Sequence, residues 1–214
     1  MAVSVVLSEV QRAALEALCD TFAAPVERDD DPTGFWARGA SDLQIPAVIE
    51  QQLAGGLVPE EQLDGLRQLL DALAAQGIVE APLAAREQIV KAFMDDPQAL
   101  AGIGPLKGLT HLLFYALPDP ATGRNPNWEA IGYPGPRAVP PSPDEAPKTI
   151  TVTRPEGEEL TLTADVVVIG SGSGGGVVAG HLATNGKDVV VLEAGGYYNE
   201  ADFNQLELWA YENL

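Results

Sequence analysis

Three glycines and one glutamate carry the clearest chemical signal in this 214-residue sequence. Gly170, Gly172 and Gly175 fill the pattern G-x-G-x-x-G directly after an apolar run, and Glu193 follows about 20 residues later. In a dinucleotide site the first glycine permits a sharp turn, the second lets the backbone approach a pyrophosphate, and the third lets the next helix pack closely. A carboxylate placed like that of Glu193 accepts hydrogen bonds from ribose hydroxyls. Together these residues predict a seat for the adenosine half of a dinucleotide.

The elements that must position these residues follow in the right order. An apolar strand is expected at 166–169, a helix at 176–184 and a second strand at 188–192, with a helix stop at Asn185-Gly186. The free N–H groups and the dipole at the start of the helix favour an anionic ligand. The sequence therefore predicts a βαβ unit with the glycines at its first turn.

Two other interpretations of the glycine run stay open. Gly174, Gly176 and Ala179 fit a looser form of the same pattern, although the strand would then end four residues too early. Alternatively, the unit binds nothing, and Glu193 is a solvated acid at a strand end. The complete order of strand, turn, helix, strand and acid favours the first register and a bound nucleotide.

The composition is that of a globular protein with a strong excess of acid. It is 46% hydrophobic and 20% charged, and its 31 acidic and 12 basic residues give a net charge of −19. This charge argues against nucleic acid or an anionic membrane as the main partner. The chain start lacks the pattern of a signal peptide, and no apolar run reaches the ~18 residues expected of a membrane span. A cytoplasmic location is expected.

The sequence contains one cysteine and two histidines. Cys19 is the single cysteine, which excludes an internal disulfide and a Cys-based zinc site, and its place on an apolar helix face indicates a buried thiol. The run Asp29-Asp30-Asp31 lacks the spacing of a calcium loop and is expected to be a solvated turn. His111 and His181 are expected in packing or at the surface. No metal site is predicted.

The first 116 residues predict an all-helical domain. A capping box at Ser8 begins a first helix that stops before Pro25, and Gly55-Gly56 ends the second. Gly102, Gly104 and Pro105 are expected to kink or delay the start of the last helix. Hydrophobic spacing places the later helices at 46–53, 59–76, 82–94 and 100–116.

The segment 117–148 is rich in proline and predicts an extended linker, ordered where Trp128 and Tyr133 can dock. Short β-prone runs at 149–153 and 159–163 then suggest a hairpin.

The last part of the chain, 149–214, is predicted to be an incomplete Rossmann-like domain that ends in a helix near Trp209. The fold class is thus α/β, with a helical domain at 1–116, a linker at 117–148 and this domain. A single βαβ unit leaves its sheet exposed. We therefore interpret the chain as an N-terminal fragment, or as one that depends on a partner chain.

The glycine run resembles the N-terminal FAD signature of the glucose-methanol-choline (GMC) oxidoreductases. The similar strings are Gly-Ser-Gly-Ser-Gly-Gly-Gly at 170–176 and Val-Leu-Glu-Ala-Gly at 191–195. The continuation at 196–198, Gly-Tyr-Tyr, resembles the long-chain (fatty) alcohol oxidase branch in particular. The N-terminal helical part, with Cys-Asp-Thr-Phe at 19–22, is similar to the helical extension of that branch and to the small helical subunit of gluconate dehydrogenases.

This resemblance implies an FAD-dependent oxidoreductase that acts on the CH–OH group of a small-molecule alcohol and passes its hydride to the flavin. The residues it places at the cofactor are Gly170, Ser171, Gly172, Ser173, Gly174 and Gly175 at the pyrophosphate, and Glu193 and Ala194 at the adenosine end. The family's catalytic base is a histidine near the end of its chain, which neither His111 nor His181 matches. The resemblance therefore places the catalytic residues and the alcohol pocket outside these 214 residues.

Two rival functions remain. An NAD-dependent reductase would use the same glycine turn, and Glu193 would disfavour the 2′-phosphate of NADP. A non-catalytic helical partner subunit with a vestigial Rossmann element would need no nucleotide.

Overall fold

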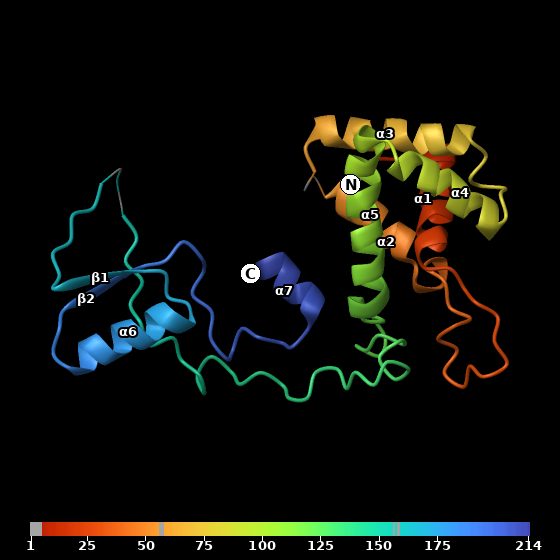
Figure 1. Ribbon diagram of the computed structural model, residues 1–214. Coiled ribbons are helices and arrows are strands. Elements are labelled where there is room, and N and C mark those ends of the chain that lie inside the picture. The colour runs from red at the N-terminus through yellow and green to blue at the C-terminus, as the bar shows by residue number, and fades with distance from the viewer. Residues whose placement is uncertain (1–5, 56–57, 156, 158) are drawn as a thin grey trace, which may run out of the picture. The chain divides into compact units, whose positions relative to one another are not determined.

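The computed structural model describes residues 6–55, 58–155, 157 and 159–214. The chain forms two compact units, of which the first ends at Gly135 and the second spans Pro136–Leu214. Figure 1 shows the first as a helical bundle and the second as a small sheet with its own helices. The division falls within the stretch expected to be a linker, and the limits 1–116, 117–148 and 149–214 stay a prediction.

Helix α1 (Glu9–Phe22) is the centre of the first unit. Ser8 caps it as predicted: the Ser8 Oγ accepts the Gln11 N–H at 3.2 Å, and the Gln11 Oε1 accepts the Ser8 N–H at 2.9 Å. Its buried face, which includes Leu15, Leu18 and Cys19, packs on the four helices that follow. The buried thiol expected at Cys19 is confirmed.

The other helices of the unit wrap α1 and complete its core. They are η1 (Ser41–Leu43), α2 (Ile45–Ala54), α3 (Glu60–Ala75), α4 (Leu83–Met94) and α5 (Pro97–Ala116). In Figure 1, α3 lies across the bundle over α1 and α5. The leucine stripe predicted on α3 buries Leu70 and Leu73 completely. Gly55 caps α2, and Gly56, the other half of the expected helix stop, lies outside the described residues.

The expected delay at the start of α5 is wrong. The helix begins at Pro97, because the Asp96 side chain caps it by accepting the Gln98 N–H at 2.9 Å, and it continues through Pro105. Packing explains the glycine at position 102, because a Cβ on Gly102 would lie 2.8 Å from the Leu69 Cδ2 on α3. The glycine therefore leaves room for the end of the Leu69 side chain.

The segment after α5 is ordered against the end of that helix. Trp128 is 3% exposed and donates its indole N–H to the Tyr115 carbonyl at 2.7 Å. The Asn127 Nδ2 donates to the Phe114 carbonyl at 2.8 Å, and the Asn125 Nδ2 donates to Leu117 at 2.8 Å. These side chains satisfy carbonyl groups that every helix leaves free at its end. The proline-rich stretch is thus part of the first unit as far as Gly135.

The second unit contains the βαβ element predicted from the sequence. Strands β1 (Val166–Ile169) and β2 (Val189–Leu192) are parallel, with Val166 opposite Val189 and Ile169 opposite Leu192. Helix α6 (Ser173–Thr184) connects them and packs on both (Figure 1). Helix α7 (Glu207–Asn213) follows near the end of the chain, as expected.

The predicted hairpin is not formed by the described residues. Neither 149–153 nor 159–163 forms a strand, and Glu156, in the predicted turn, lies outside the described residues. The Tyr197 hydroxyl instead accepts the N–H of Ile150 at 3.3 Å. The Ile150 side chain is 69% exposed, so it gains little from packing against other apolar residues in this part of the chain.

Within the ranges described above, no helix has both the length and the apolar character needed to cross a membrane.

Candidate dinucleotide-binding site

The candidate site begins where β1 ends. Gly170 donates its N–H to the Leu192 carbonyl at 2.8 Å, which is the last link between the two strands. The chain then turns with a φ of +87° at Gly170, a conformation that favours glycine. This is the sharp turn that the sequence assigned to the first glycine.

Close packing restricts the glycines of the loop to different degrees. A Cβ at Gly175 would lie 1.9 Å from the Gly170 carbonyl oxygen, a separation that no side chain tolerates. A Cβ at Gly172 or Gly174 would meet no heavy atom within 4 Å. Gly175 is thus required by close packing and Gly170 by its positive φ, and both belong to the first register. Gly176, of the other register, meets the milder restriction of a Cβ 3.2 Å from the Ser171 carbonyl oxygen.

Helix α6 starts earlier than the sequence suggested. It begins at Ser173 with Gly172 as its N-cap, and the Gly176 N–H donates to the Gly172 carbonyl at 2.8 Å. The predicted start at Gly176 is wrong. Glycine has a low helix propensity, which argued against helix within the glycine run, but packing on the sheet determines where this helix begins. The first turn of the helix therefore lies inside the glycine run.

The backbone N–H groups of this first turn are available to a ligand. Those of Ser173, Gly174 and Gly175 come before Gly176, whose N–H is the first to find an acceptor within the helix, and no side chain caps the helix start. Because no Cβ protrudes from Gly172 or Gly174, the approach to them is open. An uncapped helix start of this kind suits a phosphate.

Glu193, the residue after β2, directs its carboxylate to the glycine loop. Its Oε2 accepts both the Ser171 N–H and the Ser171 hydroxyl, each at 2.7 Å, and its Oε1 accepts the Gly195 N–H at 2.8 Å. These bonds, that from Gly195 first, lower the pKa of the Glu193 carboxyl to about 2. The group is therefore ionised throughout the neutral range and can act only as an acceptor.

The carboxylate retains capacity for one more donor. Two carboxylate oxygens offer about four lone-pair positions, and Ser171 and Gly195 together fill three of them. The remaining position is on Oε1. Displacement of the Ser171 hydroxyl would release a second, which is what a ribose diol requires.

The structure brings most of the predicted residues together and adds one. The six residues from Gly170 to Gly175 form the turn and the helix start, Glu193 faces them, and Ala194 follows as an exposed residue. Gly195 was missed as a contact residue. No sequence signal marked it, because the known tendency to bind a backbone N–H two residues ahead belongs to the shorter Asp and Asn side chains.

Neither histidine donates to or accepts from the residues of this loop among the hydrogen bonds of the described residues. His181 is exposed on α6, and His111 belongs to the first unit, where its Nε2 lies 3.1 Å from the Phe22 carbonyl oxygen. Within the described part of the chain, no three histidine, cysteine or acidic side chains are grouped so as to hold a metal ion.

Comparison with known proteins links the chain to two groups of oxidoreductases. Residues 9–135 match the family model described as gluconate 2-dehydrogenase subunit 3. Long-chain-alcohol oxidase FAO3 of Arabidopsis thaliana is 33% identical over 120 residues, which make up 44% of this chain and 16% of that protein. Long-chain-alcohol oxidase FAO4B of the same plant is 45% identical over 62 residues, 28% of this chain and 8% of that protein.

The chain thus spans less than a fifth of the length of these relatives. No solved structure matches it.

Proposed function

This chain belongs to the gluconate 2-dehydrogenase subunit 3 family, and because it also carries a glycine loop faced by Glu193, we propose that it is the N-terminal part of an FAD-dependent oxidoreductase acting on CH–OH groups. The similarity to long-chain-alcohol oxidases supports an alcohol as the substrate. The chain would contribute the adenosine half of the flavin site. The remaining chemistry would come from residues beyond this sequence or on a partner chain.

One observation carries the proposal: the Glu193 carboxylate and an uncapped helix start face the same loop. The N–H groups of Ser173, Gly174 and Gly175 would hold the pyrophosphate. Gly172 would let it approach, since nothing lies within 4 Å of a Cβ built there. Glu193 would accept the ribose hydroxyls in place of the Ser171 hydroxyl.

These residues fit the adenosine diphosphate group in charge and in shape. The helix start offers donors to the phosphates, and Glu193 offers acceptors to the ribose. When bound, FAD would supply the hydride acceptor for alcohol oxidation. The residues of this chain would bind and orient it, and none of them would transfer a proton.

The experiment is a titration of the purified chain with ADP and with FAD, followed through the backbone amide NMR signals of residues 171–176. Both ligands should shift these signals. Gly172→Ala should abolish the shift without loss of fold, because its Cβ meets nothing in the free protein. Gly180→Ala, at an equally open position later in α6, is the matched control and should bind as the native chain does.

Glu193 is tested by the ribose end of the ligand. Adenosine 2′,5′-diphosphate differs from AMP only by its 2′-phosphate and should bind at least about tenfold more weakly than AMP, because two anions would meet at the ribose. Glu193→Gln should reduce this discrimination. If ADP and FAD leave the amide signals unchanged, or if both variants bind like the native chain, the flavin site is refuted. Tighter binding of NADH than of FAD would favour the NAD-dependent reductase instead.

The family match supports a second role for residues 9–135, that of a non-catalytic helical module. The relatives in this family are named as a subunit, and the first unit has a core of its own. Under this role the helical unit would stay folded in a variant of the βαβ unit that no longer binds nucleotide. Unchanged melting of Gly172→Ala together with lost ADP binding would agree with that division of labour.

A further inference from the structure

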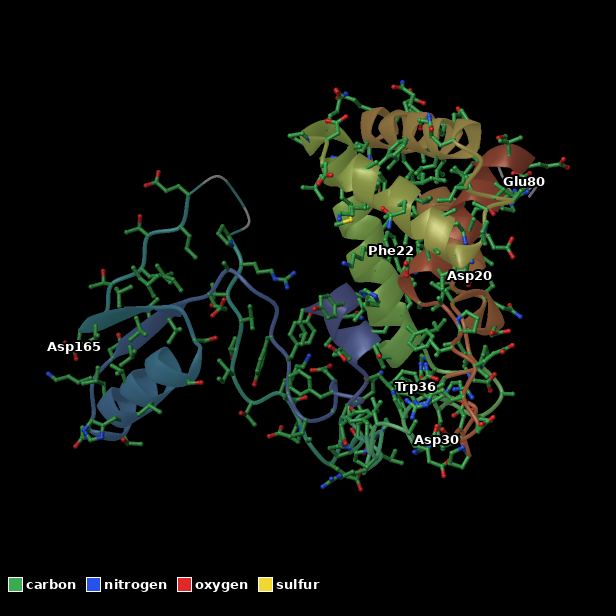
Figure 2. The ribbon with its side chains drawn as sticks, turned by 45° about the vertical axis from the view of Figure 1, so that its right-hand side comes forward. Asp20, Phe22, Asp30, Trp36, Glu80 and Asp165 are labelled. Carbon is green, nitrogen blue, oxygen red and sulfur yellow. The ribbon has the colours of Figure 1, made fainter. Side chains whose placement is uncertain are left out.

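A pocket in the helical unit has no part in the proposed flavin site. Its volume is about 180 Å³, and it lies between the end of α1, the loop after it and the last turns of α5. Its lining includes the His111 imidazole and five larger aromatic rings: Phe22, Phe35, Trp36, Phe114 and Tyr115. Figure 2 labels Phe22, at the end of α1, and Trp36, in the following loop. None of the sequence patterns described above predicted this pocket.

The rings hold one another in edge-on contacts. Phe35 lies edge-on to Trp36 at a centroid distance of 5.2 Å and to Phe114 at 6.1 Å. Phe114 lies edge-on to Tyr115 at 5.2 Å. The Arg28 guanidinium stands over the Trp36 ring, 4.8 Å from its centroid. The pocket wall is therefore built from fixed aromatic surfaces, and an aromatic guest is the one that such surfaces favour.

The volume limits the guest to a single ring. An apolar cavity of about 150 Å³ accepts benzene. A pocket of about 180 Å³ therefore has room for one six-membered ring and a small substituent. Its walls are also partly open, because Trp36 is 42% and Tyr115 is 40% exposed. A ligand can thus enter from solvent without opening the helical core.

Arg38 supplies a positive charge to this aromatic wall. One terminal nitrogen of its guanidinium donates to the Asn127 Oδ1, and the other donates to the Thr33 carbonyl at 3.1 Å. Both partners are neutral, and no ion pair of Arg38 occurs among the residues that the structure describes. By contrast, Arg12, in the same unit, binds a carboxylate at 2.7 Å.

The acids that flank Arg38 in the sequence, Asp31 and Asp42, both accept backbone N–H groups, and that of Asp42 comes from Gly39 at 2.7 Å. The Asp31 carboxylate accepts the N–H of Phe35 at 2.8 Å and that of Ala37 at 2.9 Å. Of the five N–H donors of a guanidinium, Arg38 uses two. Three remain, which is enough for a carboxylate from outside the chain.

We propose that this pocket binds a small aromatic monocarboxylate, with its ring among Phe35, Trp36 and Phe114 and its carboxylate on Arg38. The ring would pack against the aromatic side chains of the pocket. The carboxylate would give Arg38 the negatively charged partner that Asn127 and Thr33 do not provide. The proposal stands independently of the flavin site, since it uses only residues of the helical unit.

The test is calorimetric titration of the purified chain with benzoate as the probe. Benzyl alcohol carries the same ring without the charge, and acetate carries the charge without the ring. We expect benzoate to bind at least about tenfold more tightly than either, because a charge-assisted pair with Arg38 and burial of the ring each contribute at least that factor.

Three variants assign the binding to this pocket. Arg38→Gln should weaken benzoate binding about tenfold and leave benzyl alcohol binding unchanged. Trp36→Ala, at a partly exposed position, should weaken both ligands. Arg12→Gln removes a surface cation elsewhere in the unit and should change neither.

Equal binding of benzoate and benzyl alcohol would overturn the proposal, as would unchanged benzoate binding to Arg38→Gln. If Arg38→Gln melts at a lower temperature than the native chain, Arg38→Lys replaces it. That variant keeps the charge and should bind benzoate between the native chain and Trp36→Ala. Lack of any heat with benzoate would also refute the site.

Discussion

Replacement of Gly175 by alanine should destabilise the βαβ unit, whereas the same replacement at Gly180 should stabilise it. Both glycines lie in α6. A Cβ at Gly175 would lie 1.9 Å from the Gly170 carbonyl oxygen, so the backbone of the turn and that of the helix must separate by about 1.1 Å to reach the closest tolerated contact. At Gly180 a Cβ would meet nothing within 4 Å.

The magnitudes follow from these two surroundings. Overpacking costs about 1–3 kcal/mol, and the upper end applies at Gly175 because the obstructing atom is backbone. The helix propensity gained on replacing glycine by alanine returns about 1 kcal/mol. We therefore expect Gly175→Ala to lose about 2 kcal/mol and Gly180→Ala to gain about 1 kcal/mol.

Hydrogen exchange of the α6 amides in the whole chain measures both changes locally. Exchange should become about 30-fold faster in Gly175→Ala and about fivefold slower in Gly180→Ala, given a factor of ten for each 1.4 kcal/mol. The amides of α1, in the other unit, are the internal control and should keep their rates. If Gly175→Ala exchanges at the native rate or more slowly, the packing of α6 on the glycine turn described here is wrong.

Three further outcomes are expected. Asn127→Ala should lower the free energy of unfolding by about 0.5–1.5 kcal/mol in urea denaturation, because it removes one of the two buried amide donors of the Phe114 carbonyl, the other being Asn125; an unchanged or higher free energy of unfolding would contradict this. Cys19 should not react with a thiol reagent at pH 8 until the chain unfolds, because burial raises its pKa to about 11; rapid reaction in the folded chain would refute it. The Glu193 carboxyl should titrate near pH 2 by carbon NMR, and Ser171→Ala should raise that pKa. Since its pKa is depressed in the folded state, its contribution to stability should be complete above its ordinary value of 4.5 and disappear as the pH falls to about 2; an ordinary pKa in the native chain would show that the loop contacts are absent.

The sequence predicted those features that depend on neighbouring residues. Ser8 and Gln11 are three positions apart and cap α1 as a pair, and the stripe that includes Leu70 marked the buried face of α3. The turn at Gly170 and the acid after β2 were likewise predicted from the spacing of the glycines and of Glu193. Each is a local pattern whose physical demand can be read from a few adjacent residues.

The features that were missed depend on contacts between distant segments. Asn125 and Asn127 lie in a proline-rich stretch and gave no sign that they bind the end of α5. Arg38 is one of 12 basic residues, and only the fold brings it to the aromatic pocket. The early start of α6 was missed because helix propensity counts glycine as unfavourable, while packing on the strands determines where this helix begins.

The way α5 is closed has a consequence for how this protein responds to its solution. A cation near the C-terminal end of a helix stabilises the partial negative charge there, and this effect weakens in salt. Here the amides of Asn125 and Asn127 and the indole of Trp128, all uncharged donors, perform that task. In a chain with 31 acidic residues and 12 basic ones, this closure is indifferent to both ionic strength and pH. The C-terminal end of α5 should thus stay intact at high salt concentration, where the surface ion pair between Arg12 and Glu50 is screened.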